Sequence, residues 1–223
     1  MVISTLDALN NDPWLLSLPS VARAQIIEAT TVKKLSANHV LYRKGDEADY
    51  LNCVLSGRLR AEATTFLGNE LVMTSLSPGQ WFGVVAILDN KGRTHDVVAN
   101  EESTLAFIPK SILVNLSKKD YAVHQAMVTM LCDHCRQAFE LIDKFLLYNP
   151  EQRLAARLLK TVQSIAPLSE IKINQEELSK QVGISRQSIN KILKKWESDE
   201  WIKLAYSSIS IKNERRLTNL LQA

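Results

Sequence analysis

The sequence predicts an α+β fold in which a β-barrel is followed by one long helix and then by a small C-terminal domain. Three observations support this order. Residues 40–108 carry turn signals about every 11 residues, which is typical of a compact all-β unit. Residues 120–147 contain no Gly or Pro, and residues 174–211 read as two short helices and a hairpin. The predicted domains are residues 1–119, 120–148 and 149–223.

Composition and charge favour a folded protein with a basic C-terminal third. The chain has 223 residues, of which 46% are hydrophobic and 23% charged. Residues 1–150 hold 14 Lys and Arg against 16 Asp and Glu, a net of −2, whereas residues 151–223 hold 13 against 8, a net of +5. This asymmetry predicts a polyanionic partner for the C-terminal third. With no apolar run of about 18 residues and only three cysteines, we expect a cytoplasmic protein without a membrane partner.

The apolar spacing of the long segment predicts a helix that pairs with a second copy of the chain. One set of residues is spaced 4-3-4-3-4, as in a coiled-coil seam. The predicted dimer interface consists of Met127, Leu131, His134, Ala138, Leu141 and Phe145. Packing of this helix on its own barrel is the alternative. Asn149, Pro150 and Gln152 then predict a new helix, because they fit the N-cap, the first helical position and a capping box.

The stretch "INQEELSKQVGISRQSINKILKKW" has the spacing of a helix-turn-helix. Asn174 and Glu177 form a predicted capping box, Gly183 allows a tight turn, and Ser185 caps the second helix. An ordinary helical hairpin with a solvated face is the alternative. "WIKLAYSSISIKN" follows as a strand–turn–strand pattern suited to a wing.

The second helix leaves a polar and basic set outside its apolar stripe. Arg can bind guanine through two hydrogen bonds, Gln or Asn can do the same with adenine, and Lys suits phosphates. We therefore predict binding to double-stranded DNA. The predicted DNA-binding residues are Ser185, Arg186, Gln187, Asn190, Lys191 and Lys194.

The chain resembles the Crp/Fnr family of bacterial transcription regulators over nearly its whole length. The resemblance rests on "KGDEADYLNCVLSGRLR", "PGQWFG" and "VGISRQSINKIL". It implies a homodimer with a cupin-like, cyclic-nucleotide-binding-like sensor barrel and a winged helix-turn-helix that binds a palindromic operator. It also implies RNA polymerase as a partner. Gln187 stands where the family usually has Glu, which changes the expected half-site preference.

In cyclic-nucleotide-binding members, the resemblance implies a pocket with a Gly-Glu pair, then Arg and a hydroxyl residue, and adjacent Thr and Ser on the long helix. The corresponding pocket residues here are Gly83, Val84, Arg93, Thr94, Ala138 and Phe139. Three polar partners of the nucleoside are thus replaced by apolar residues. Because each lost hydrogen bond costs about 1–3 kcal/mol, we expect weak cyclic AMP binding, with an unidentified small anion as the alternative ligand. Arg93 as a surface arginine beside Asp89 and Asp96 is the competing interpretation.

The triplet Cys132, His134 and Cys135 suggests a redox, haem or metal function as an alternative. A structural zinc site would need a second pair of ligands, so we predict no metal site and no bound cofactor. We also predict that the protein is not an enzyme, because the sequence has no phosphate-binding Gly-rich loop and no nucleophile elbow. A protein-interaction module that does not bind DNA is the remaining alternative.

Overall fold

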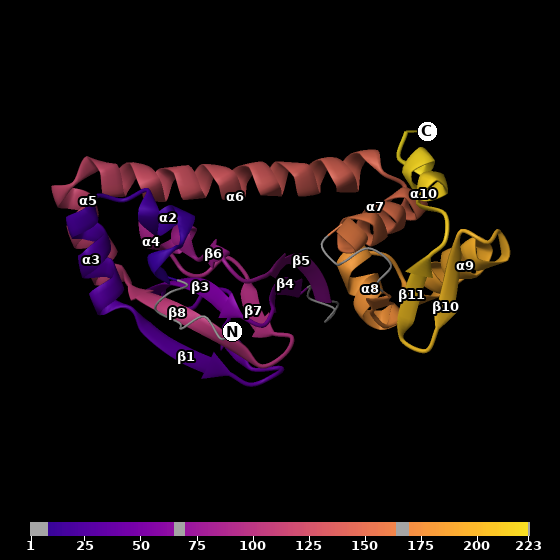
Figure 1. Ribbon diagram of the computed structural model, residues 1–223, viewed down its shortest axis with the longest axis horizontal. Coiled ribbons are helices and arrows are strands. Elements are labelled where there is room, and N and C mark those ends of the chain that lie inside the picture. Colours follow the sequence, from indigo (N-terminus) through magenta and orange to yellow (C-terminus); the bar gives the residue numbers. More distant parts are fainter. Residues whose placement is uncertain (1–8, 65–69, 164–169, 223) are drawn as a thin grey trace. The chain divides into compact units, whose positions relative to one another are not determined.

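The computed structural model describes residues 9–64, 70–163 and 170–222. These residues form two compact units, Met1–Arg136 and Gln137–Ala223. Figure 1 labels their elements and shows α6 (Tyr121–Leu147) as one continuous helix. The N-terminal unit combines β-sheets with helices, and the C-terminal unit combines helices with a small sheet. The predicted α+β class, with a barrel, a long helix and a helix-turn-helix, is confirmed.

The N-terminal unit is built on two four-stranded antiparallel sheets. Their strand orders are β1-β8-β3-β6 and β2-β7-β4-β5. The strands are β1 (Thr31–Leu35), β2 (Val40–Tyr42), β3 (Tyr50–Ser56), β4 (Leu59–Thr64), β5 (Glu70–Leu76), β6 (Trp81–Phe82), β7 (Asp96–Ala99) and β8 (Ser103–Pro109). Apart from the β4–β5 pair, strands adjacent in sequence are split between the sheets, so the two sheets enclose one interior, as in a jelly roll.

Apolar side chains from both sheets fill this barrel interior. Alternate residues of a strand point to opposite faces, so each strand contributes one inward set. The cluster consists of Leu35, Val54, Leu59, Ala61, Leu76, Phe82, Val97, Ala99, Leu105 and Phe107. Tyr42 and Tyr50 pack against its edge. The barrel interior therefore offers an apolar and aromatic lining to any polar group placed there.

A second apolar cluster lies on the helical side of the first sheet. The helices are α2 (Pro13–Leu16), α3 (Ser20–Ala29), α4 (Val84–Asp89), α5 (Lys110–Lys119) and the first part of α6. Leu51 and Ile108 of the sheet and Val123 of α6 are completely buried there. The Asp12 carboxylate ties the layers together, because it accepts hydrogen bonds from the Trp81 indole at 3.1 Å and from the Leu15 amide at 3.0 Å.

The C-terminal unit has its own core between four helices and a three-stranded sheet. Its elements are α7 (Pro150–Gln163), β9 (Ile171–Lys172), α8 (Gln175–Val182), α9 (Arg186–Ser198), β10 (Ile202–Ala205), β11 (Ser208–Ile211) and α10 (Glu214–Leu220). The predicted capping box at the start of α7 is confirmed in both directions. The Gln152 amide donates to Asn149 Oδ1 at 3.0 Å, and the Asn149 amide donates to Gln152 Oε1 at 2.9 Å.

Candidate nucleic-acid interface and sensor pocket

The turn between α8 and α9 has the backbone geometry that a helix-turn-helix requires. Asn174 Oδ1 accepts from the Glu177 amide at 2.8 Å and starts α8. Gly183 ends α8 in the left-handed conformation, with φ +70°, which a residue without Cβ adopts readily. Ser185 Oγ then accepts from the Ser188 amide at 3.1 Å and starts α9. The predicted N-caps and turn are confirmed. In a capping box the Glu177 carboxylate would accept from the Asn174 amide, but the donor seen here is the Gln181 side-chain amide.

The apolar stripe of α9 fixes its orientation within the C-terminal unit. Ile189, Leu193 and Trp196 are completely buried, and they share a core with Leu178 of α8 and Leu154 of α7. The Trp196 indole donates to Glu151 Oε1 at 2.8 Å. Since one face of α9 is held in this way, the opposite face is presented to solvent at a fixed angle.

The exposed face of α9 brings most of the predicted DNA-binding residues together. Arg186, Gln187, Asn190 and Lys191 line one hollow of about 520 Å³. Lys194 is exposed one turn further along the helix. Asn190 is less free than the sequence suggests, because it is half-buried and its amide donates to Gln175 Oε1 at 3.1 Å. The roles of these residues in reading DNA stay a prediction.

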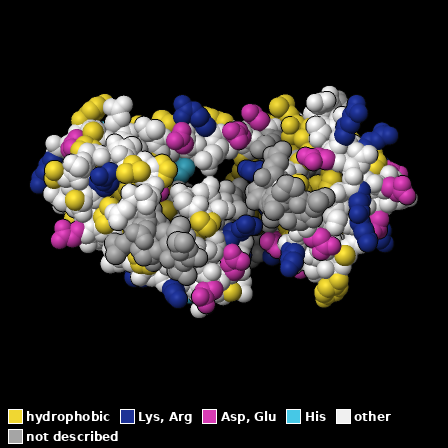
Figure 2. Space-filling view, in the orientation of Figure 1, with side chains coloured by type: hydrophobic (Ala, Val, Ile, Leu, Met, Phe, Trp, Pro, Cys, Tyr) yellow, Lys and Arg dark blue, Asp and Glu magenta, His cyan; other side chains and the backbone are white. Residues whose placement is uncertain are grey.

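The predicted wing is present as an antiparallel hairpin. Ile202 pairs with Ile211 and Ala205 with Ser208, so the strands β10 and β11 meet in full register. The turn between them exposes Tyr206 to 99%, a residue that sequence reasoning did not single out. An aromatic residue within a predicted turn was the available signal. Figure 2 shows Lys and Arg side chains spread over the surface of this unit.

Arg93 is a buried cation at the edge of the barrel interior. Only 5% of the residue is exposed, and its guanidinium carbon lies 4.2 Å from the centre of the Tyr42 ring. Nη2 donates to the Tyr50 carbonyl oxygen at 2.7 Å, whereas Nε and Nη1 have no hydrogen-bond partner among the described residues. Burial lowers the pKa of Arg93, and Tyr42, Asp49 and Asp46 partly offset this effect. The surface-arginine interpretation was therefore wrong.

Gly83 leaves space for this guanidinium. A Cβ atom added at residue 83 would collide with Nη1 of Arg93. The residue also has φ +94°, which disfavours any side chain. Tyr42 and Tyr50 complete the surroundings of Arg93, although sequence reasoning did not identify them as pocket residues.

The structure places the other predicted pocket residues in different surroundings. Val84 is completely buried in the helical core cluster, so its assignment to the pocket is corrected. Thr94 is exposed, and its Oγ1 lies 3.0 Å from His95 Nδ1. Ala138 and Phe139 are exposed on α6, in the part of the chain that belongs to the C-terminal unit.

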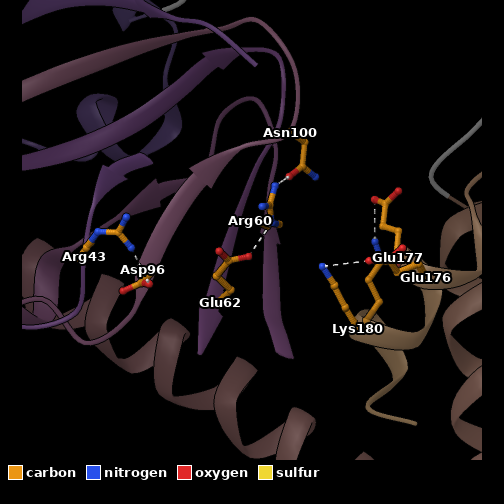
Figure 3. A network of polar contacts seen from close by, with 9 residues as sticks. Arg43, Arg60, Glu62, Asp96, Asn100, Glu176, Glu177 and Lys180 are labelled. Carbon is orange, nitrogen blue, oxygen red and sulfur yellow. Dashed lines mark hydrogen bonds and ion pairs between the residues drawn. The ribbon is translucent and has the colours of Figure 1, made fainter. Parts of the chain in front are cut away.

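Two acidic side chains of the barrel, Glu62 and Asp96, are already paired with other arginines. Figure 3 shows Arg60 between Glu62 and Asn100, with Arg60 Nε 2.6 Å from Glu62 Oε2 and Nη1 2.8 Å from Asn100 Oδ1. Asp96 lies 3.8 Å from Arg43, so it does not neutralise Arg93. Among the described residues no carboxylate is within ion-pair distance of the Arg93 guanidinium, although Asp49 and Asp46 raise its pKa from further away.

The predicted dimer seam needs a correction on its N-terminal half. Met127 is buried in the core of its own N-terminal unit, and Leu131 packs partly against the same core. His134 Nε2 lies 3.1 Å from the Trp81 carbonyl oxygen. These residues cover their own barrel, as the alternative interpretation held. Ala138 is exposed, Leu141 is half-buried, and the side chain of Phe145 lies outside the described residues.

The cysteines and His134 do not form a metal site within one chain. Among residues 9–64, 70–163 and 170–222, no three His, Cys, Asp or Glu side chains are placed to hold a metal ion. Cys132 and Cys135 are exposed free thiols, and Cys53 is buried. In the described part of the chain, no helix has the length and apolar character needed to cross a membrane.

Two family models together match most of the chain. The model described as "Cyclic nucleotide-binding domain" matches residues 32–120, and the model described as "Crp-like helix-turn-helix domain" matches residues 152–220. The first covers the barrel that holds Arg93. The second covers α8, α9 and the wing.

Curated relatives and solved structures match most of the chain. The chain is 25% identical over 181 residues to the cyclic AMP receptor protein of Thermus thermophilus, which covers 81% of this chain and 83% of that protein. It is 25% identical over 204 residues to the fumarate and nitrate reduction regulatory protein of Vibrio cholerae, covering 88% and 80%. A Crp/Fnr-family regulator from Eubacterium rectale matches 96% of this chain and 100% of its own at 21% identity, with a TM-score of 0.82. The chain belongs to the Crp/Fnr family of transcription regulators, which are not enzymes.

Proposed function

We propose that two copies of this chain form a dimer that binds a palindromic DNA operator through the exposed face of α9. One observation carries the proposal: Arg186, Gln187, Asn190 and Lys191 surround a single hollow on a helix whose other face is locked into the core. Arg and Gln can each form paired hydrogen bonds with a base edge, and the lysines can neutralise phosphates. A regulator of this kind acts where its DNA and RNA polymerase are, in the cytoplasm.

The dimer contact that we propose is an exposed stripe on α6. It is displaced by one residue, or about 100° around the helix, from the seam predicted by the sequence. The stripe residues are Val128, Cys132, Cys135, Phe139, Ile142 and Leu146, all exposed and spaced 4-3-4-3-4. A repeat of this period fits a second helix that runs alongside. A two-fold dimer would place two copies of α9 on successive major grooves of DNA.

The sensor barrel, in this proposal, binds an anion and discriminates against cyclic AMP. The support is the unpartnered Nε and Nη1 of Arg93 in an aromatic setting, because a buried cation without a partner is costly. Val84 gives no carboxylate for a ribose hydroxyl, and Glu62 is already held by Arg60. Either inorganic phosphate or a more apolar anion would satisfy the guanidinium.

Two titrations of the full-length protein test this proposal. The first follows the fluorescence anisotropy of a labelled random-sequence duplex at several salt concentrations. If about six phosphates are contacted, the logarithm of affinity should fall with the logarithm of salt concentration with a slope of about −5. Binding that does not respond to salt would contradict DNA recognition by this basic face. The second compares cyclic AMP and inorganic phosphate by calorimetry, and tight cyclic AMP binding would contradict the proposed pocket.

A further inference from the structure

Two free thiols lie within the exposed stripe of α6. Cys132 and Cys135 are exposed, whereas Met127 and Met130 on the same helix are buried against the N-terminal unit. The thiols therefore point away from the chain's own core. They are three residues apart, with Val128 before them and Phe139 after them in the same 4-3-4 repeat.

The repeat places both thiols at the central positions of a two-stranded contact. With Val128 at heptad position d, Cys132 falls at a and Cys135 at d. In a parallel, two-fold dimer, residues with the same number at a and d positions face each other across the axis. The residues that flank the stripe do not introduce repulsion between like charges across this contact. Leu131 and Ala138 on one side are uncharged, and Arg136 and Asp143 on the other have opposite charges.

The distance across such a contact suits a disulfide bond. Packed helix axes lie about 8–10 Å apart, and Cα atoms lie about 2.3 Å from the axis. Residues that face each other directly therefore have Cα atoms roughly 3.4–5.4 Å apart, a range that overlaps the approximately 4.4–6.8 Å that a disulfide spans. Cys132 can therefore form a disulfide with Cys132 of a second copy, and Cys135 with Cys135. A disulfide between Cys132 and Cys135 of one helix is not favoured, because their side chains point in nearly the same direction instead of toward each other.

We propose that Cys132 and Cys135 form disulfides between the two copies of the chain when the protein meets a peroxide. The inference rests on the proposed dimer through α6. A cysteine sulfur attacks the peroxide, the O–O bond breaks, and a sulfenic acid and one water form. The facing thiol attacks the sulfenic sulfur, so an S–S bond forms and a second water leaves. Two thiols and one hydrogen peroxide thus give one disulfide and two waters.

The third cysteine serves as an internal control. Cys53 is 1% exposed and sits in the core cluster behind the first sheet. Burial, and to a lesser extent Asp12, raises the pKa of Cys53 to about 12. It therefore stays protonated and out of reach of a peroxide in the folded protein.

The test compares sedimentation of the reduced full-length protein with non-reducing gel electrophoresis after hydrogen peroxide. We expect a non-covalent dimer that peroxide converts into a band at twice the monomer mass, reversed by dithiothreitol. Cys53→Ser should behave like the wild type. Cys132→Ser and Cys135→Ser should each retain a covalent dimer, which can then join only residues with the same number, and the double variant should lose it.

Cysteines introduced at other positions of α6 test whether cross-linking requires this helix register or results from random collision. In the Cys132→Ser/Cys135→Ser background, Phe139→Cys should restore the covalent dimer, because residue 139 is the next a position. Gln137→Cys, on an exposed face away from the stripe, should not. A reduced dimer that peroxide does not cross-link overturns the inference and leaves the proposed function standing. A protein that is monomeric and not cross-linked overturns both. Zinc bound at one ion per dimer, with thiols that resist peroxide until chelation, would replace the disulfide with a four-thiolate metal site.

Discussion

The guanidinium of Arg93 lies 4.2 Å from the centre of the Tyr42 ring at the edge of the barrel interior, where Arg93 is buried and Tyr42 is half-buried. Burial raises the pKa of Tyr42 to about 12, although the positive charge of Arg93 acts in the opposite direction. The phenol therefore stays neutral, and it cannot neutralise the guanidinium. The barrel thus holds a buried positive charge that Asp49 and Asp46 offset only in part, and whose Nε and Nη1 have no hydrogen-bond partner among the described residues.

Replacing this cation should remove an anion-dependent stabilisation. With wild-type protein, we expect inorganic phosphate to raise the thermal midpoint by a few degrees, since 1 kcal/mol corresponds to roughly 2–4 °C in a protein of this size. Arg93→Met should show no phosphate effect. Without phosphate it should be as stable as wild type or more stable, because an uncompensated buried charge is gone. Arg43→Met, at an exposed arginine, is the matched control and should keep the response.

The burial of His134 predicts a loss of stability in mild acid. Burial lowers the pKa of His134, and the backbone contact and Asp133 offset this only in part. Below the ordinary histidine pKa of about 6.5, the unfolded chain takes up a proton before the folded chain does. The free energy of unfolding should therefore fall as pH drops through that value.

Urea unfolding at a series of pH values measures this effect. His134→Gln should flatten the pH dependence, whereas His124→Gln, at an exposed position of the same helix, should not. An unchanged profile in His134→Gln would show that other groups, His95 first among them, account for the acid sensitivity. The pKa of His95 is also lowered, chiefly by burial.

Local sequence signals predicted the elements better than the faces that they bury. The caps at Asn149, Asn174 and Ser185 follow from side-chain chemistry within a few residues, and the structure contains all three. The faces of α6 do not follow in this way. The helix carries two apolar repeats of equal period, one residue apart, starting at Met127 and Val128. Only contacts with the barrel, which are distant in sequence, decide which repeat is buried.

The pocket residues, too, could be predicted only in part from local sequence. Arg93 and Gly83 were recognised from a short motif, and the structure brings them together. Val84 follows Gly83 directly, but the left-handed turn at Gly83 starts α4, which directs Val84 into the helical core. Tyr42 reaches Arg93 from a separate strand, so no spacing along the chain could predict it.

A charge on the exposed stripe of α6 should separate the two copies. Phe139 is 65% exposed in the single chain and lies at the centre of the proposed dimer contact. Burying an unpaired carboxylate there costs about 3–5 kcal/mol, so Phe139→Glu should weaken the dimer by roughly two to three orders of magnitude. Sedimentation velocity at micromolar concentration measures the change. Gln137→Glu adds the same charge off the stripe and should remain dimeric. Dimerisation of Phe139→Glu equal to wild type would place the contact elsewhere.

Residues on α9 should divide into those that make base-specific contacts and those that contact the DNA phosphates. Arg186→Ala should cost about 1–3 kcal/mol of specific binding and relax preference at one base pair. Lys194→Ala should weaken all sequences alike and reduce the salt slope by about one. Competition titrations with single-base variants of a bound site distinguish the two effects. Equal losses on every site for Arg186→Ala would assign that residue to phosphate.

Selection of bound duplexes from a random DNA pool is the sharpest test of recognition by two α9 helices, because every possible operator sequence competes in the same pool. We expect an enriched two-fold palindrome whose half-site centres lie about one helical turn, or roughly 10 base pairs, apart. The same selection with Arg186→Ala should retain the spacing but lose information at one symmetric pair of positions. Enrichment of a single, non-palindromic site, or no enrichment at all, would contradict recognition by a two-fold pair of α9 helices.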